Sequence, residues 1–486
     1  MFPALTLILM STLTQDPAND KDTPLSQVER KNRAPVSPEM LRVTLPKPFE
    51  TRLDNGLTVM ILEDHRTPVV TAELTIYGAG EQFVPVKEAG VANFAAQLLN
   101  KGTKGKSGRQ IAEEIERLGA TLQVHASYGG ESTSLQLTAL KETFDRALRA
   151  AADVLVNPTF PEDEIARLRE RELAALPQML MSPEYLVSAK FGTALYGEHP
   201  MAVEGPTAAT LAQLNRAQLV KWHRERYAPQ NAILMIAGDV DTHALMSRIK
   251  LLSFVWTRQA FEPHLTAIPA ASTARRVVVI NRPGSVQTTL RMGNLAIDRR
   301  HGDYFALTIA NRILGGGSSG RLFLNLREEK GYTYGIYSQL QARRQAGPWQ
   351  ISGDLKADST GDAMREILRE IERLREEPVP AAELEEAKRS IVASFALSLE
   401  QPSRIMQYAA DRFRYQFDAD YWDHYPAQLA AVTPDDVRRV ARQYLNPGAL
   451  QIVAVGDAAL LKGALSEWGE VDVEEAEATS AAPVKP

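Results

Sequence analysis

Cysteine is absent from the 486 residues of this chain. Its absence excludes disulfide bonds, thiol catalysis, zinc sites built on thiolates and anchoring as a lipoprotein. The compartment stays open, because export does not require disulfides. An excess of positive charge is also missing, since 55 Lys and Arg oppose 60 Asp and Glu for a net charge of -5. This balance argues against nucleic acid as the main partner.

Long apolar runs are missing as well, so no integral membrane span is predicted. The first residues, M-F-P-A-L-T-L-I-L-M-S-T-L-T-Q, hold a short apolar run without a positively charged start. This run is either the apolar part of a secretory signal or a frayed apolar N-terminus. Residues 15–46 are polar, charged and contain proline, which is typical of a flexible lead-in. We therefore treat residues 1–46 as a signal-like, flexible segment.

Histidine pairs at helical spacing are the third absence. The chain has eight histidines, and no two of them lie within one helical turn. The zinc motifs H-x-x-E-H and H-E-x-x-H, which place two imidazoles on one helix face, therefore do not occur. Any zinc site in this chain would need substitute ligands.

From Phe49 onward the pattern of apolar residues is regular. The turn signal Asp54-Asn55-Gly56 between strand formers predicts a β-hairpin. Apolar periodicity further predicts strands at 69–77, 121–127 and 132–140 and helices at 108–118, 141–155 and 162–180.

An internal repeat divides the chain. The segment from Leu211, L-A-Q-L-N-R-A-Q-L-V-K-W-H-R-E-R-Y, is matched by L-A-A-V-T-P-D-D-V-R-R-V-A-R-Q-Y from Leu429, and each precedes a buried strand ending in Gly-Asp. A second match joins two helices closed by glycine, 109–119 and 321–331. Strands and helices in blocks predict an α+β fold of two related halves with mostly antiparallel sheets packed against helices. We expect the halves at 47–262 and 274–470, a linker at 263–273, and a disordered acidic tail at 471–486.

One amphipathic helix carries the first recognisable motif. In E-A-G-V-A-N-F-A-A-Q-L-L-N-K-G-T, from Glu88 to Thr103, the apolar residues recur at helical spacing. Gly102 suits a left-handed C-cap that would end this helix.

This helix resembles the first active-site helix of the insulinase/pitrilysin metallopeptidases, which reads G-x-A-H-x-x-E-H-x-x-x-x-G-T. In that family the two histidines bind zinc and the glutamate activates water. Here Asn93 and Gln97 replace the histidines and Ala96 replaces the glutamate. The family's third ligand is a glutamate farther along the chain, near Glu172, which without histidine partners is a solvated helical residue. Rescue of the zinc site by a distant histidine such as His199 is the alternative.

A second segment, L-G-G-G-S-S-G-R-L-F-L-N-L-R-E-E-K-G-Y-T-Y-G-I-Y, contains Gly315, Gly316 and Gly317. No G-K-[ST] follows, so this is not a phosphate loop. The resemblance implies that the glycines border a cleft; a helix connection needing positive φ angles is the alternative. Arg327 and Tyr334 match the family's L-R-x-x-x-G-x-x-Y, a pair that reaches the substrate backbone and stabilises an oxyanion. Their alternative is an exposed arginine and a core tyrosine.

The resemblance covers the chain from about Phe49 to Asp457 and implies two halves that face each other across a cleft. It also implies a function. In some members of the family one subunit binds zinc and its sister supplies the Arg/Tyr pair. We therefore expect a non-catalytic subunit without activity alone, which binds no cofactor and clamps unfolded peptides in trans to a zinc-bearing H-x-x-E-H partner.

Two alternatives stay open: an inert scaffold or peptide-binding protein, and an active peptidase with substitute ligands. The resemblance favours a periplasmic or secreted location, with a cytoplasmic one as the alternative.

Overall fold

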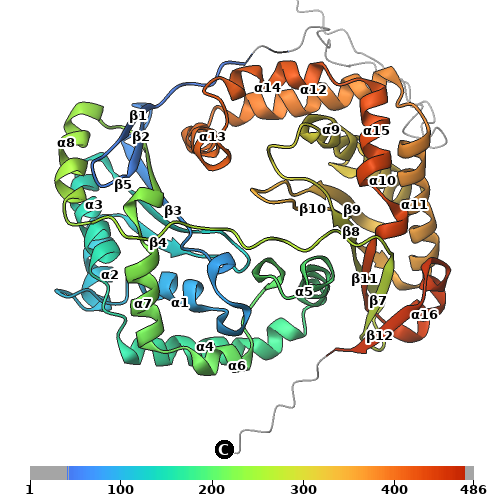
Figure 1. Ribbon diagram of the computed structural model, residues 1–486, viewed down its shortest axis with the longest axis horizontal. Helices are drawn as coiled ribbons and strands as arrows, with labels where there is room; N and C mark the ends of the chain where they lie inside the picture. Colours follow the sequence, from blue (N-terminus) through green and yellow to red (C-terminus); the bar gives the residue numbers. More distant parts are fainter. Residues whose placement is uncertain (1–40, 42, 477–486) are drawn as a thin grey trace, which may run out of the picture. The chain divides into compact units, whose positions relative to one another are not determined.

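The computed structural model describes residue 41 and residues 43–476, so most of the signal-like segment lies outside the described residues. Within this part, the strands form two six-stranded sheets, ordered β1-β2-β6-β3-β5-β4 and β12-β7-β11-β8-β10-β9 (Figure 1). In the first sheet only β2 and β6 pair in parallel; in the second, β7 pairs in parallel with β11 and β12. The predicted α+β class with mostly antiparallel sheets is confirmed.

The first half follows the predicted elements closely. Its strands are β1 (Phe49–Arg52), β2 (Thr58–Glu63), β3 (Val69–Tyr77), β4 (Thr121–His125), β5 (Ser132–Leu140) and β6 (Ala232–Gly238). Its helices are α1 (Val91–Leu98), α2 (Gly108–Arg117), α3 (Lys141–Val156), α4 (Glu162–Leu180), α5 (Pro183–Tyr196), α6 (Ala208–Gln213), α7 (Arg216–Arg226) and α8 (Thr242–Ser253). Gly56, at the predicted hairpin turn, has φ +91°, a conformation that glycine adopts at low cost.

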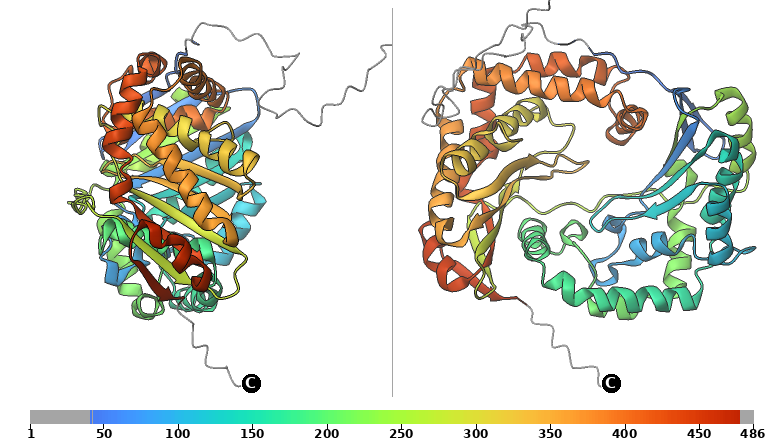
Figure 2. Two further views of the ribbon diagram at one scale, coloured as in Figure 1. Left: turned by 90° about the vertical axis from the view of Figure 1, so that its right-hand side faces the viewer. Right: turned by 180° about the vertical axis from the view of Figure 1, so that it is seen from behind.

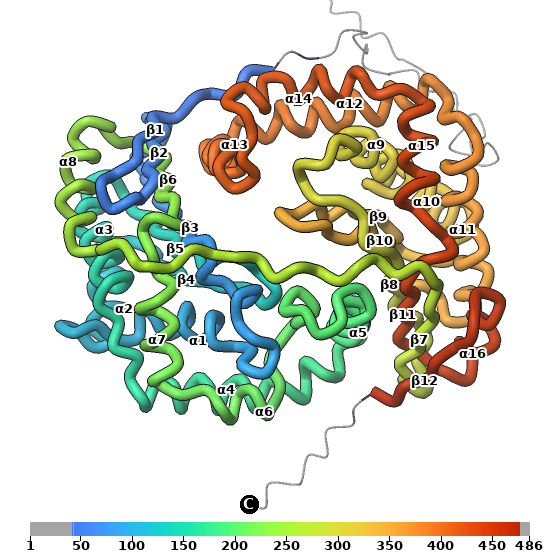
Figure 3. Tube along the Cα trace, viewed as in Figure 1, coloured from blue at the N-terminus to red at the C-terminus, as the bar shows by residue number. Residues whose placement is uncertain are grey.

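The second half repeats this order. Its strands are β7 (Arg276–Asn281), β8 (Gln287–Leu295), β9 (Thr333–Leu340), β10 (Pro348–Lys356), β11 (Gln451–Gly456) and β12 (Val471–Glu475). Its helices are α9 (Tyr304–Gly315), α10 (Arg321–Phe323), α11 (Thr360–Glu376), α12 (Ala381–Ser398), α13 (Pro402–Tyr415), α14 (Tyr421–Ala430), α15 (Pro434–Tyr444) and α16 (Ala458–Leu465). The segment that joins α8 to β7 holds neither helix nor strand and runs extended in Figure 3.

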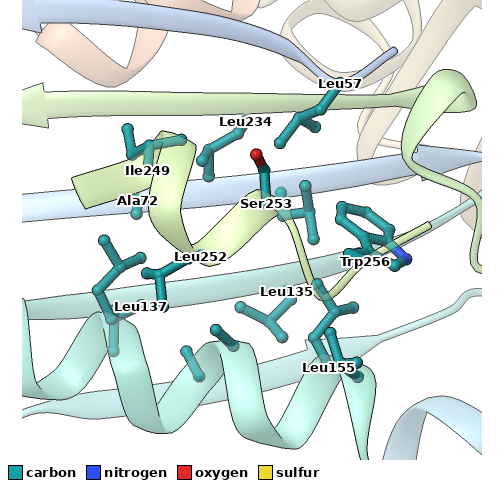
Figure 4. Close-up of a pocket in the computed structure, with 15 residues that line it drawn as sticks. Leu57, Ala72, Leu135, Leu137, Leu155, Leu234, Ile249, Leu252, Ser253 and Trp256 are labelled. Atoms are coloured by element: carbon teal, nitrogen blue, oxygen red, sulfur yellow. The ribbon is translucent and has the colours of Figure 1, made fainter. Parts of the chain in front are cut away.

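Helices cover the sheets, as the views in Figure 2 show. In the first half, α3 and α8 pack on one face of the sheet and enclose a small apolar cavity of about 70 Å³ (Figure 4). Apart from Ser253 and the indole nitrogen of Trp256, side chains without polar atoms line this cavity. It belongs to the hydrophobic core and offers no group for catalysis. No helix in the described part of the chain is both long enough and apolar enough to cross a membrane.

One helix of each half packs against the sheet of the other half. Helix α5 buries Val187 and Phe191 in a cluster with Leu295 and Val453 of the second sheet. The helix at the corresponding place of the repeat, α13, packs Met406 and other residues against the first sheet, on Met60, Ile233, Met235 and Ala237. The two clusters therefore tie both halves together through side chains that neither half could bury alone.

Two predictions about the ends of elements are wrong. The helix predicted at 88–103 is shorter, because Gly90 takes φ +107° directly before Val91 and the helix ends at Leu98. Gly102 is not left-handed; it bridges Ser107, and a Cβ there would lie 2.8 Å from Oγ1 of Thr159. Tight packing, and not a positive φ angle, requires glycine at this position.

The predicted disordered tail is also wrong at its start. Residues 471–475 form β12, which pairs in parallel with β7 from Val277 to Asn281. β12 is an edge strand in which Val471 and Glu474 are half-buried and Asp472, Val473 and Glu475 are exposed. Its acidic composition gave no sign of a strand. The rest of the tail, residues 477–486, lies outside the described residues.

Candidate functional site

The degenerate zinc motif lies on α1, whose residues Phe94, Ala95 and Leu98 are buried in the core. Asn93 and Gln97 are one turn apart, and Nε2 of Gln97 donates to Oδ1 of Asn93 at 2.7 Å. Nδ2 of Asn93 donates to the carbonyl of Ala126 at 2.8 Å, directly after edge strand β4. The two amides thus bond to each other and attach α1 to the end of β4.

Helix α4 completes this site with an arginine. Nη2 of Arg171 donates to Oε1 of Gln97 at 2.7 Å and to Oε1 of Glu172 at 3.1 Å. The predicted site residues Asn93, Gln97 and Glu172 are therefore brought together, as the resemblance implies. A single cationic nitrogen bridges the oxygens of Gln97 and Glu172.

These residues do not fit a zinc ion. Zinc binds imidazole, thiolate or carboxylate, whereas both amide oxygens here already accept hydrogen bonds and a guanidinium is among the donors. Ala96 is buried and carries no group that could accept a proton. Among the described residues no group of three or more His, Cys, Asp or Glu could hold a metal.

His199 does not rescue the motif. Its Nδ1 accepts from the backbone N–H of Met201 at 3.1 Å, and its Nε2 lies 3.1 Å from the carbonyl of Thr266. The side chain is buried, and both ring nitrogens are occupied by the backbone. We therefore assign His199 a structural role between η3 (Pro200–Ala202) and the segment before β7.

A buried carboxylate also belongs to this site. Glu81, in η1 (Glu81–Phe83), is 3% exposed and accepts from the N–H groups of Gly90 at 3.1 Å and Asn93 at 2.7 Å. It caps the N-terminus of α1, which has no cap from an adjacent residue. Burial raises the pKa of the Glu81 carboxyl to about 7, and the backbone N–H groups offset this only partly.

Arg327 lies at the end of a helical segment, as predicted, although the local geometry differs. After α10 the chain forms a π-helical stretch, η5 (Leu324–Glu329), and Gly331 with φ +65° ends it. The guanidinium of Arg327 lies over the ring of Phe323, 4.8 Å from its centroid. Its side chain is 45% exposed, and its ion pair with Glu328 is long at 3.6 Å. Most of its N–H donors therefore face solvent.

Tyr334 lies on β9, one of the two edge strands of the second sheet. The residue is 78% exposed, so the alternative of a core tyrosine is wrong. Among the described residues, no hydrogen bond joins Tyr334 to Arg327 or to the residues of the zinc motif. Arg327 and Tyr334 thus present a guanidinium and a phenol beside β9, an edge strand whose backbone at Ser338 is covered by Asn311 of α9.

The three glycines end α9 and begin the loop toward α10. None of Gly315, Gly316 and Gly317 has a positive φ angle, so the alternative that required one is wrong. A Cβ on Gly315 would lie 2.7 Å from the backbone nitrogen of Ser338, and one on Gly316 would lie 2.8 Å from Cα of Arg312. Close packing against the backbone therefore requires glycine at these two positions, whereas a Cβ on Gly317 would meet only the movable end of the Arg312 side chain.

Two residues of the site, Arg171 and Glu81, were not identified from the sequence. Arg171 stands in a run of charges, R-L-R-E-R-E, in which nothing distinguishes a surface arginine from one that bonds to α1. Glu81 is separated from the helix that it caps by nine residues and η2 (Val86–Glu88), so no capping spacing could reveal it. The one available signal for Arg171 was its place beside Glu172.

Family models match both halves of the chain. Residues 58–202 match "Insulinase (Peptidase family M16)", and residues 213–391 match "Peptidase M16 inactive domain". The chain is 27% identical over 413 residues to a protein of Mycobacterium tuberculosis named "Uncharacterized zinc protease", with 82% of this chain and 91% of the relative covered. A Bacillus subtilis protein with the same descriptive name is 26% identical and covers 80% of this chain and 93% of the relative.

Two solved structures have the same fold as this chain. A Pseudomonas fluorescens structure described as a peptidase M16 inactive domain has a TM-score of 0.76 and 27% identity, covering 84% of this chain and 98% of that one. A protease from Helicobacter pylori has the same fold, with a TM-score of 0.74 and 23% identity over 85% of this chain and 100% of that one. From the two family models, the curated relatives and the Pseudomonas structure together, the chain belongs to the insulinase, or M16, family of peptidases.

Proposed function

We propose that this chain is the non-catalytic subunit of a two-subunit zinc peptidase and clamps a peptide in trans to a zinc-bearing H-x-x-E-H partner. The observation that carries the proposal is the contrast between its two motifs. At the place of the metal, Arg171, Gln97 and Asn93 form a closed chain of hydrogen bonds. At the other motif, Arg327 and Tyr334 are exposed and present most of their donors to solvent.

The chemistry of the exposed pair supports a role on a peptide backbone. Guanidinium and phenol groups donate hydrogen bonds, and a carbonyl oxygen under attack at a neighbouring zinc gains negative charge that such donors stabilise. Tyr334 also stands near the start of an edge strand, ahead of Ser338, whose carbonyl accepts from Asn311 of α9. The partner would supply the zinc and its activated water, while this chain orients the substrate.

A peptide-binding protein without any link to hydrolysis is the second candidate. The hydrogen-bonded network at Arg171 favours it, because the network has no catalytic group and leaves edge strand β4 free. An exposed Arg327 and Tyr334 favour the first candidate, since a simple scaffold gains nothing from two solvent-facing donors at motif positions.

Substitutions in a reconstituted complex test the proposal. With an H-x-x-E-H partner, Arg327→Ala should lower kcat/KM on a quenched peptide by roughly 100-fold, in the range of one lost oxyanion donor. Tyr334→Phe removes only the hydroxyl and should act in the same direction. Arg369→Ala, at an exposed arginine of α11 that forms an ion pair with Glu366, is the matched control. Full activity of the Arg327→Ala complex would contradict the proposal.

A further inference from the structure

A polar cavity of about 270 Å³ lies outside both motifs, between the β4–β5 turn and the β9–β10 connection. From the first half, His125 at the end of β4 and residues 127–131 line it. From the second half, Arg343, Arg344 and Arg414 line it. We call this cavity the arginine pocket.

Positive charge exceeds negative charge in the arginine pocket. Its one lining carboxylate, Glu131, is 7% exposed, bonds to Nε of Arg414 and lies 3.6 Å from Nη1 of Arg344. Nη2 of Arg343 donates to the neutral amide of Gln341 at 2.9 Å. Each guanidinium has five N–H donors, so these bonds use a minority of them. A locally cationic pocket thus exists on a chain whose net charge is -5.

Neutral polar groups complete the lining. Nε2 of Gln82 donates to Oε1 of Gln345 at 2.9 Å, and this bond joins the two halves beside the pocket. Tyr128 also lines the pocket, but its buried hydroxyl lies toward Gly90 at the start of α1 and not among the arginines.

The pocket adjoins a free sheet edge. β4 pairs with β5 on one side only, and its exposed residues alternate with partly buried ones up to His125. An extended peptide that pairs with β4 would direct every second side chain toward the same face. A peptide on this edge would therefore carry one side chain, or its own C-terminus, past the arginine pocket.

We propose that the arginine pocket binds a carboxylate of an extended peptide, and that the peptides this protein takes are acidic. Arginine matches a carboxylate with two parallel hydrogen bonds, and three arginines against one glutamate leave room for a second carboxylate. The carboxylate comes from an Asp or Glu side chain or from the peptide C-terminus. The inference rests on the proposed function only in that its ligand is a peptide.

Binding of four peptides to the full-length chain tests the inference. Fluorescein-labelled nonapeptides share one sequence, carry either glutamate or glutamine at three alternating positions, and have either a free or an amidated C-terminus. Alternation places a carboxylate at the pocket in several registers. By fluorescence anisotropy at low salt, we expect carboxylate peptides to bind at least tenfold more tightly than the glutamine amide.

The four peptides distinguish a side-chain carboxylate from a C-terminal carboxylate. Preference for glutamate irrespective of the C-terminus assigns the pocket to side chains, and preference for the free C-terminus assigns it to chain ends. Equal affinity of all four peptides, or no measurable binding of any, would overturn the inference. Because the chain is acidic overall, its net charge would give the opposite preference.

Two substitutions that should change the affinity for acidic peptides in opposite directions exclude a merely structural effect. Arg344→Gln leaves the Glu131–Arg414 pair intact and should reduce acidic-peptide affinity about tenfold without affecting the glutamine amide. Glu131→Gln removes the competing carboxylate and should increase acidic-peptide affinity. Arg109→Gln, at an exposed arginine of α2, is the control. Weakening by both pocket substitutions would contradict the inference.

The outcome is independent of the proposed function. Cleavage of the uncharged peptide by a reconstituted complex depends on Arg327 and not on Arg344. If the pocket inference fails, the dependence on Arg327 is unaffected; if the proposed function fails, the preference for carboxylates in the isolated chain is unaffected.

Discussion

At the scale of single residues, one arginine decides the chemistry of the degenerate motif. The guanidinium of Arg171 bridges α4 and α1 through Gln97, at the place where the resemblance puts a metal ion. Its positive charge therefore joins the two helices in the absence of metal ligands. A guanidinium does not activate water, so Arg171 holds the helices together without supplying hydrolytic chemistry.

Arg171 should therefore oppose any repair of the metal site. We expect Asn93→His with Gln97→His to bind zinc weakly, because the guanidinium repels the ion and occupies Glu172. Adding Arg171→Ala should strengthen binding at least tenfold, since two imidazoles and Glu172 then form a three-ligand set. Competition with a chelating dye measures both affinities. Equal zinc affinity with and without Arg171 would contradict this role.

The buried Glu81 should make stability depend on pH. Its pKa is about 7 in the folded protein against 4.5 as the ordinary value, so the folded state holds the proton more tightly. The free energy of unfolding should then decrease as pH rises from about 4.5 to about 7, by roughly 3 kcal/mol from this group. Denaturant titrations at several pH values measure the slope. Glu81→Gln should remove this part of the slope; an unchanged slope would contradict the assignment.

At the scale of elements, helices α5 and α13 are the pieces that join the halves. Phe191 of α5 is buried against the second sheet although it belongs, by sequence, to the first half. Phe191→Ala should lower the free energy of unfolding by about 3–5 kcal/mol. It should also speed hydrogen exchange in β8 and β11, where its partners lie. Faster hydrogen exchange confined to β3 and β5 would contradict the packing of α5 on the second sheet.

Sequence periodicity was sufficient for elements whose patterns are local. The bounds of β3 (Val69–Tyr77) and α4 (Glu162–Leu180) were predicted to the residue, because alternation and helical spacing are set by each segment's own buried face. The strand at 471–475 was missed, since its partner β7 lies almost two hundred residues earlier.

The candidate site was predictable only at positions that the family's motifs mark. Asn93 and Gln97 stand at the replaced zinc-motif positions, and Arg327 and Tyr334 match the second motif. Arg171 and the arginine pocket depend on which segments fold together: the pocket unites Glu131 with Arg344 and Arg414 across more than two hundred residues of sequence. No periodicity within a segment records such pairing.

At the scale of the whole molecule, the part from Leu41 onward forms one unit by its contacts. In addition to the packing of α5 and α13, ion pairs connect the halves, among them Arg412 with Glu50 and Lys190 with Glu474. The apolar faces of α5 and α13 are buried only when the two halves are packed together. The two halves should therefore act as one cooperative body.

Unfolding should accordingly occur in a single transition. We expect intrinsic fluorescence and far-ultraviolet circular dichroism to give coincident denaturant curves, because loss of either sheet exposes an apolar cluster of the other half. Two separated transitions would show that the halves fold independently.

The most direct measurement of the central claim compares three samples. Cleavage of a quenched peptide and zinc content are measured for this chain alone, for an H-x-x-E-H partner alone, and for their equimolar mixture. The account predicts no zinc and no cleavage for this chain alone, and cleavage in the mixture well above that of the partner. Stoichiometric zinc with peptide cleavage by the isolated chain would contradict it.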